Sequence, residues 1–344
     1  MSTDRGRFGA GDGQLRDAVR ARAVVLRAIR QFFDRRGFLE VDPPQVATSP
    51  GLEVHLDAMR VDLRAGMGGR PVVRYLTTSP EYYCKRLLSA GFERIYALQH
   101  AFRSGESGAH HNPEFMMLEW YRAGAGWRHI AADVRALLGH CASALRAAGF
   151  DGACGERSRY DPQQPWTRLG VRAALRRWAG FDPIGPPDRV LARARRAGVE
   201  VRAGDTVADV LVQALVERVE PRLRDLPVVV LAPWPAVLAS LARPVPGRPE
   251  LAERFEVYLR GVELANGFGE LTDAGEQRRR FEQDLADRQR LGKPAYPMDE
   301  RFLAALADGM PPASGVALGV DRMLMALLGL GNVRGVMAFP FDQA

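Results

Sequence analysis

Hydrophobic and polar positions along the chain predict a mixture of helices and strands. Apolar residues recur at near-helical spacing from Leu15 to Phe33, and a short strand follows that two prolines close at Pro43 and Pro44. Further along, apolar and polar residues alternate over 72–78 and again over 94–102, which is typical of strands. A helix is predicted between these two strands.

The stretch from Phe102 to Arg122, FRSGESGAHHNPEFMMLEWYR, is the most informative part of the chain. As a strand it divides into two faces. One face carries Phe115, Met117, Glu119 and Tyr121, and the other carries Glu114, Met116, Leu118 and Trp120. A carboxylate among apolar neighbours needs a cationic partner or a water-filled pocket. Taken alone, the stretch is equally compatible with a structural strand whose acids meet arginines.

A second segment, FEVYLRGVELANGFGEL over 255–271, places two acids around a glycine-rich turn. Glu263 and Glu270 lie seven residues apart, and the glycines between them allow a ligand to approach the backbone closely. Such acids can hold magnesium on a polyphosphate. The alternative is a hairpin with exposed acids.

Two helix starts carry residues that helix stability alone explains only in part. Ser79-Pro80-Glu81 has a capping residue, a proline and an acid in their favoured order, so Glu81 could be an ordinary first-turn acid. The run SGVALGVDRMLM places Arg322 near the start of an apolar helix, against the helix dipole. An anion or a stacked ring explains this guanidinium better.

Composition favours a basic globular protein of the cytoplasm. Of the 344 residues, 47% are hydrophobic and 26% are charged, and no apolar run approaches a membrane span. The net charge is +7, and Lys85 and Lys293 are the only lysines. The charge is scattered, which speaks against a nucleic-acid-binding protein with clustered charge. The three cysteines show no metal-ligand spacing, and we expect reduced thiols.

Domain organisation follows from the same patterns. Residues 1–14 are predicted to be a disordered tail and 15–344 a single catalytic domain, with a largely helical insertion at about 123–225. The charged helix over 278–291 has the pattern of a solvated face, and the stretch 244–249 that of a surface loop.

Together, these segments resemble the three motifs of class II aminoacyl-tRNA synthetases. The first helix and strand correspond to motif 1, FR…HNPEF…EWYR to motif 2, and GVALGVDR to motif 3. TSPEY and GVELANGFGEL narrow the similarity to the lysine branch, and more specifically to the elongation factor P lysine ligase family. The resemblance implies an α+β catalytic domain with an antiparallel sheet flanked by helices, a homodimer formed through motif 1, and no anticodon-binding barrel.

The resemblance also implies a role for each motif residue. Arg103 would contact the α-phosphate of ATP and the substrate carboxylate, while Arg322 and Phe115 would lie on opposite faces of the adenine. Further nucleotide contacts would be Ser104, Gly105, Asn112, Glu263, Leu264 and Gly319. The amino acid would be bound by Ser79, Pro80, Glu81, Glu119, Tyr121, Asn266, Phe268, Glu270 and Ala317. Glu263 and Glu270 would hold Mg²⁺.

Three positions depart from the family pattern. Gly105 stands where motif 2 usually has an acid, and Glu106 follows it. Gly269 replaces a histidine. Ala317 stands where lysyl-tRNA synthetases have glycine, and we hypothesise that its methyl group crowds the α-amino position and favours a β-amine.

The function implied is activation of (R)-β-lysine with ATP and its transfer to a lysine ε-amine of elongation factor P. Two alternatives remain open at this point. One is a free-standing lysine-adenylating enzyme with another acceptor, which includes tRNA. The other is a non-catalytic synthetase paralogue that senses an amino acid, although such a protein would be expected to lose Arg103, Arg322 or the metal acids.

Overall fold

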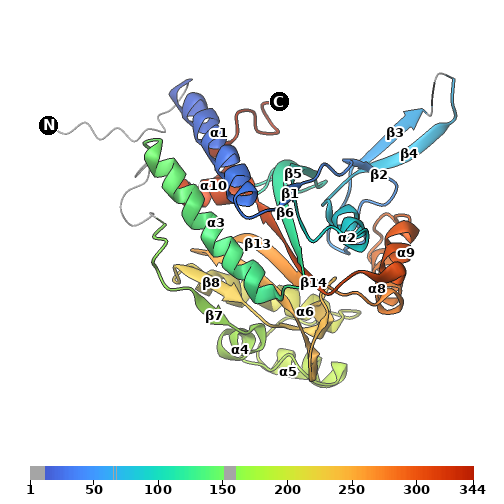
Figure 1. Cartoon of the computed structure of the whole chain (residues 1–344). Coiled ribbons are helices and arrows are strands. Elements are labelled where there is room, and N and C mark those ends of the chain that lie inside the picture. Colours follow the sequence, from blue (N-terminus) through green and yellow to red (C-terminus); the bar gives the residue numbers. More distant parts are fainter. Residues whose placement is uncertain (1–11, 65, 67, 151–159) are drawn as a thin grey trace.

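An eight-stranded sheet runs through the molecule (Figure 1). The computed structural model describes residues 12–64, 66, 68–150 and 160–344. In spatial order the strands are β1 (Leu39–Glu40), β5 (Arg94–Phe102), β6 (Glu114–Ala123), β14 (Ala313–Gly319), β13 (Val262–Gly269), β12 (Arg254–Leu259), β8 (Val228–Leu231) and β7 (Thr167–Leu169). The inner pairs are antiparallel, and only the two edge pairs, β1–β5 and β7–β8, are parallel. The predicted α+β fold with an antiparallel sheet is confirmed.

One face of the sheet is covered by three helices, α1 (Asp12–Asp34), α3 (Trp127–Ala147) and α10 (Val320–Leu328). Phe33 of α1 stacks on Tyr96 of β5 with ring centroids 4.5 Å apart, and Trp120 of β6 is fully buried beside them. Because side chains alternate along β6, this burial turns Glu119 and Tyr121 to the opposite face.

The opposite face is covered at its two ends. At one end lie α2 (Glu81–Ser89), α8 (Ala274–Arg290) and α9 (Glu300–Gly309), with their own apolar cluster. At the other end lies a second cluster formed by the segment between α3 and β8. Its helical elements are α4 (Val171–Ala174), α5 (Pro187–Arg196), α6 (Val207–Ala214), α7 (Glu220–Leu223) and the π-helical turns Leu175–Ala179 and Leu215–Val219. The middle of this face, formed by β6, β14 and β13, is the floor of the candidate site.

Two small sheets complete the fold. One consists of β2 (Val46–Ala47), β4 (Pro71–Leu76) and β3 (Arg60–Arg64), and Figure 1 shows its β3–β4 hairpin projecting from the body. The other consists of β10 (Pro244–Val245), β11 (Arg248–Ala252) and β9 (Trp234–Pro235). The predicted loop over 244–249 is therefore a hairpin. The 3₁₀ turns are Ala236–Leu238 and Val333–Val336.

Predicted boundaries agree with the structure to within a few residues: the strand expected over 72–78 spans 71–76, and the helix expected over 278–291 spans 274–290. The strand predicted over 94–102 has those bounds, but the first helix already begins at Asp12, and residues 1–11 of the expected tail lie outside the described residues. Helix α8 is not simply a solvated face, because Arg288 is fully buried.

Two further expectations from composition can be compared with the structure. Cys84 and Cys141 are buried free thiols, and Cys154 lies outside the described residues. Within the described part of the chain, no helix has the length and apolar character needed to cross a bilayer.

Candidate active site

A single large cavity brings the sequence-predicted residues together. Its volume is about 960 Å³, near the upper end of the range of about 300–1,000 Å³ found for ligand pockets. It is lined by residues from all the informative segments. Of the predicted site residues, only Pro80, Ser104 and Gly105 are not part of its wall.

Three neighbouring strands present their side chains to the cavity in register. Glu119 of β6 lies opposite Ala317 of β14, which in turn lies opposite Asn266 of β13. The methyl group of Ala317 therefore stands between a carboxylate and an amide. The adjacent row consists of Tyr121, Gly315 and Phe268.

Gly315 is required by close packing. A Cβ atom at this position would lie 2.2 Å from the Tyr121 ring and 2.8 Å from Glu270 Oε1. No side chain fits there without displacing both groups.

Glu119 lies at the closed end of the cavity. Its side chain is held by two hydroxyl groups, with Ser79 Oγ donating to Oε1 at 2.6 Å and Tyr121 OH donating to Oε2 at 2.8 Å. The residue is only 1% exposed. Burial raises the pKa of Glu119 to about 8; the neighbouring Glu81 adds to this shift, and the hydrogen bonds from Ser79 and Tyr121 oppose it. An empty pocket therefore holds this carboxyl largely protonated at neutral pH.

The open end of the cavity carries the two predicted phosphate-binding arginines. Arg103 lies over the Phe115 ring, 5.1 Å from its centroid, and 3.7 Å from Glu106. Arg322 donates from Nε to the His110 carbonyl at 3.0 Å and approaches the Glu263 carboxylate at 3.4 Å. The side chains of Arg103 and Arg322 are each about one-fifth exposed, so a ligand can reach them.

The motif 2 loop explains one departure from the family pattern. Gly105 has φ +80°, a conformation that disfavours other residues, and a side chain there would meet open space. Glu106, the next residue, lines the cavity beside Arg103. This position lets Glu106 supply the acid that Gly105 lacks.

Comparison with known proteins identifies the family of the chain. The family model for class II tRNA synthetases (D, K and N) matches residues 11–343. The chain belongs to the class II tRNA synthetase family. A relative in Edwardsiella ictaluri is 42% identical over 328 residues, which cover 94% of each chain. A relative in Avibacterium paragallinarum is 40% identical over 327 residues, 94% of this chain and 95% of the relative. Both are named elongation factor P–(R)-β-lysine ligase, and the chain is a member of that branch of the synthetase family.

Sequence patterns missed the most buried cation of this synthetase site. Lys85 of α2 is fully buried, and its Nζ lies 2.6 Å from both Glu81 Oε1 and Glu270 Oε2. Burial lowers the pKa of Lys85, but the two carboxylates outweigh this effect and the pKa is raised above its usual value. Burial also raises the pKa of Glu270 to about 7, although Lys85 opposes the shift. The helical spacing of Glu81 and Lys85 was the available signal.

The structure separates the two acids predicted to bind magnesium. Glu270 is tied to Lys85 and 1% exposed, whereas Glu263 lies beside Arg322. The prediction of a glycine-rich turn between the two acids is wrong, because the residues between them belong to the continuous strand β13. Seven residues of extended strand correspond to roughly 20 Å of backbone. The closer neighbour of Glu263 is Glu256, which sequence patterns also missed.

Glu256 is almost fully buried on β12. It accepts hydrogen bonds from Arg254 at 2.6 Å and from Tyr258 OH at 2.7 Å. Burial raises the pKa of Glu256 to about 7, with Arg254 opposing and Glu263 adding to the shift. Among the described residues, no group of three or more His, Cys, Asp or Glu side chains is arranged to hold a metal. Magnesium on a polyphosphate needs only one or two carboxylates.

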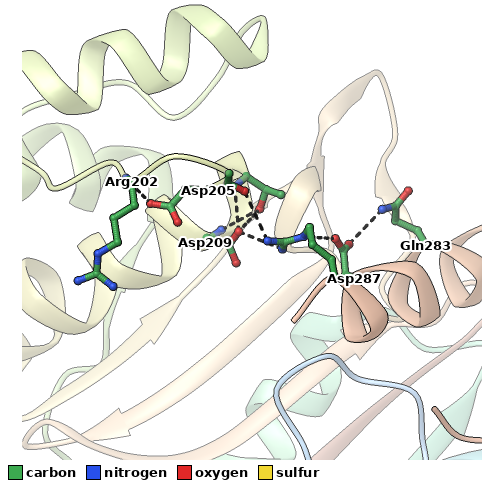
Figure 2. Close-up of polar contacts among 8 residues, drawn as sticks. Arg202, Asp205, Asp209, Gln283 and Asp287 are labelled. Carbon is green, nitrogen blue, oxygen red and sulfur yellow. Dashed lines mark hydrogen bonds and ion pairs between the residues drawn. The ribbon is translucent and has the colours of Figure 1, made fainter. Parts of the chain in front are cut away.

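The cavity wall also includes residues of α6 and α8, and this part is called the second arm. Figure 2 shows Asp287 and Gln283 on α8 across from Asp209 at the start of α6. Arg290 joins the two helices, reaching Asp209 and Asp287 at 3.2 Å each. This bridge fixes the width of the arm.

The raised pKa of Glu119 gives a testable consequence. Because a bound ammonium favours the ionised carboxylate, binding should release a proton at pH 7 and affinity should increase from about pH 6.5 to about pH 8. Titration calorimetry of (R)-β-lysine in two buffers of different ionisation enthalpy measures the proton directly. The release should become smaller in Glu119→Gln, in which Glu270, with a pKa of about 7, remains. Equal heats in both buffers for the wild type would contradict this account.

Proposed function

We propose that this protein activates (R)-β-lysine with ATP and transfers it to a lysine ε-amine of elongation factor P. The observation that supports this proposal most directly is the negative charge at the closed end of the cavity. Glu81, Glu119 and Glu270 surround it, and the single buried cation Lys85 leaves two negative charges when all four groups are ionised. A diamino acid brings two ammonium groups, which match this charge. The names of the curated relatives support the same substrate and acceptor.

In the first step the substrate carboxylate attacks the α-phosphorus of ATP and pyrophosphate leaves. Charge grows on the phosphoryl oxygens in the transition state, and preorganised cationic donors stabilise it. Arg103 is placed for this role beside Phe115, and Arg322 lies across the nucleotide end. The reaction needs no covalent bond to the protein, so positioning and electrostatics carry it.

Magnesium fits the nucleotide end rather than the amino acid end. The Glu263 carboxylate lines the cavity and is 38% exposed, so it can meet an ion held by phosphate oxygens. The nearby Glu256 adds negative charge behind it. Bound there, the ion would neutralise the phosphates. Glu270 is assigned to the amino acid because Lys85 already occupies its carboxylate.

Apolar residues exposed on the motif 1 elements support a homodimer. Leu15 and Val19 of α1 are 40% and 47% exposed, and Leu39 of β1 is 51% exposed. Burying such residues against a second copy is favourable. Sedimentation equilibrium tests this assembly, and a monomer at micromolar concentration would contradict it. The proposed acceptor, a translation factor, places the reaction in the cytoplasm.

Removing the Arg103 guanidinium should slow adenylate formation. Arg103→Ala is expected to cost about 2–4 kcal/mol of transition-state stabilisation, which corresponds to roughly 30- to 1,000-fold in kcat/KM. ATP–pyrophosphate exchange measures it, with Arg94→Ala, an exposed position of β5, as the control. Exchange within about threefold of the wild type would refute the assignment.

The Ala317 methyl group should select the β-amine. Its place between Glu119 and Asn266 restricts the space for an α-amino group. Ala317→Gly is expected to raise the rate with L-lysine relative to (R)-β-lysine by about tenfold, a change of about 1.4 kcal/mol in discrimination. Pyrophosphate exchange with each amino acid measures the ratio. An unchanged ratio would show that selection lies elsewhere.

The proposed function is tested by the intact mass of elongation factor P. The unmodified factor is incubated with the protein, ATP, magnesium and either (R)-β-lysine or L-lysine. We expect an increase of one lysyl mass, larger with the β form. Formation of AMP and pyrophosphate without a mass increase would reject this acceptor, and charging of tRNA instead would identify another. If no mass increase, no AMP and pyrophosphate and no charged tRNA are observed, the protein is non-catalytic.

A further inference from the structure

Glu53 is a carboxylate in the cavity wall that the proposed first step does not use. It lies in the loop that follows β2. Its Oε2 atom is buried and has no hydrogen-bond partner among the described residues. Burial raises the pKa of Glu53, and Glu81 raises it further, against the opposing effects of a backbone hydrogen bond, Arg103 and Lys85. A buried carboxylate oxygen without a partner is costly, so Oε2 points to a cation that arrives with a ligand.

The amino acid substrate does not account for that cation. Its two ammonium groups are already balanced by Glu81, Glu119 and Glu270 together with Lys85. Glu53 is an additional acid, and Asp284 of α8 is another. Burial raises the pKa of Asp284 to about 7, and Glu53 is the next largest cause. The two acids therefore share one region, in which Arg280 and Arg288 oppose the pKa shift of Asp284. The charged or titratable groups around Glu53 are Glu81, Tyr82, Lys85, Arg103, Asp284 and Arg288.

The loop that carries Glu53 is held in place by a buried guanidinium. Arg288 donates from Nη1 to the carbonyl of Glu53 at 2.9 Å and to that of Leu56 at 2.8 Å, and from Nη2 to Asp57 Oδ1 at 2.8 Å. The backbone carbonyl of Asp57 in turn accepts a hydrogen bond from the backbone N–H of Ser104, the residue after Arg103, at 2.6 Å. These contacts of Arg288, called the clamp, thus hold Glu53 and the loop that carries Arg103 in fixed positions relative to each other. Arg288 is a positioning residue for both.

The second arm of the cavity offers a route to Glu53. Asp284 and Asp287 of α8 line it, and its outer wall includes Val237, which is 51% exposed. Thr206, which caps α6, and residues of α6 and α8, among them Ala208 and Gln283, line this part of the cavity. The wall here carries Glu276, Asp284 and Asp287 together with Arg279 and Arg280. A cation on a long apolar stem, such as a lysine side chain, suits the acids of this passage.

We propose that Glu53 receives the ammonium group of the acceptor lysine, which enters along Asp287 and Asp284, and removes its proton. This inference rests on the proposed function, because it presupposes an adenylate and an amine acceptor. It supplies a general base for the transfer step.

In the transfer step, Glu53 takes one proton from the ammonium, and the free amine nitrogen attacks the carbonyl carbon of the adenylate. The bond from that carbon to the phosphate oxygen breaks, and AMP leaves with the electron pair. The second proton of the nitrogen is lost with the departing phosphate, which leaves a neutral amide.

The test separates the two half-reactions in Glu53→Gln. ATP–pyrophosphate exchange and trapping of the adenylate by hydroxylamine, which is a free base at neutral pH, should stay within about threefold of the wild type. Transfer to elongation factor P and to Nα-acetyl-lysine methylamide should fall by about 100-fold or more at pH 7. The loss should shrink as pH rises towards the lysine pKa of about 10.4, where the amine deprotonates by itself. Glu282→Gln, an exposed neighbour on α8, is the matched control.

Two results would overturn the inference. Transfer to the lysine derivative at the wild-type rate would show that Glu53 is not the base. A parallel loss of pyrophosphate exchange, with a raised KM for (R)-β-lysine, would assign Glu53 to the amino acid instead. Failure of the wild type to modify elongation factor P would reject the proposed acceptor. The role of Glu53 would then still be tested by the rate of transfer to the lysine derivative.

Discussion

The site depends on Lys85 and its two carboxylate partners. Three acids in a buried pocket repel one another and would otherwise be driven to protonate. A fully buried ammonium, 2.6 Å from Glu81 and from Glu270, holds both side chains in place and opposes the raised pKa of Glu270. Removing one partner of such a buried pair costs about 3–5 kcal/mol, because the remaining charge is left uncompensated. The pocket therefore gains negative charge, through ionisation of Glu119, when a cationic ligand enters.

The sheet supplies the geometry that this charge needs. Because β6, β14 and β13 pair in register, Glu119, Ala317 and Asn266 form one row across the floor, and the glycine at 315 leaves room for the Tyr121 ring. The helices α1, α3 and α10 bury the other side of the same strands, so the floor is rigid. The clamp formed by Arg288 extends this rigidity to the loop at the wall.

Much of this arrangement could be predicted from the sequence, because it depends on local patterns. Alternation alone divided β6 into two faces and placed Glu119 and Tyr121 together on one of them. Motif residues such as Arg103 and Arg322 were then found in one cavity. The residues that escaped prediction owe their roles to partners far away in the chain. Arg288 donates to a carbonyl 235 residues away in the chain. The local sequence does not reveal this partner, so the charged pattern of the helix indicated a solvated face. Glu256 became visible only when β12 paired with β13 and brought it near Glu263.

The most direct measurement of the charge-matching claim is a crystal structure with a non-hydrolysable sulfamoyl analogue of the (R)-β-lysyl adenylate. The account predicts that both ligand ammonium groups lie within hydrogen-bonding distance, about 2.7–3.2 Å, of oxygens of Glu81, Glu119 or Glu270. Lys85 should keep both of its ion pairs, and the sulfamate should lie against Arg103. A ligand with only one ammonium paired, or one that displaces Lys85 from Glu270, would contradict it.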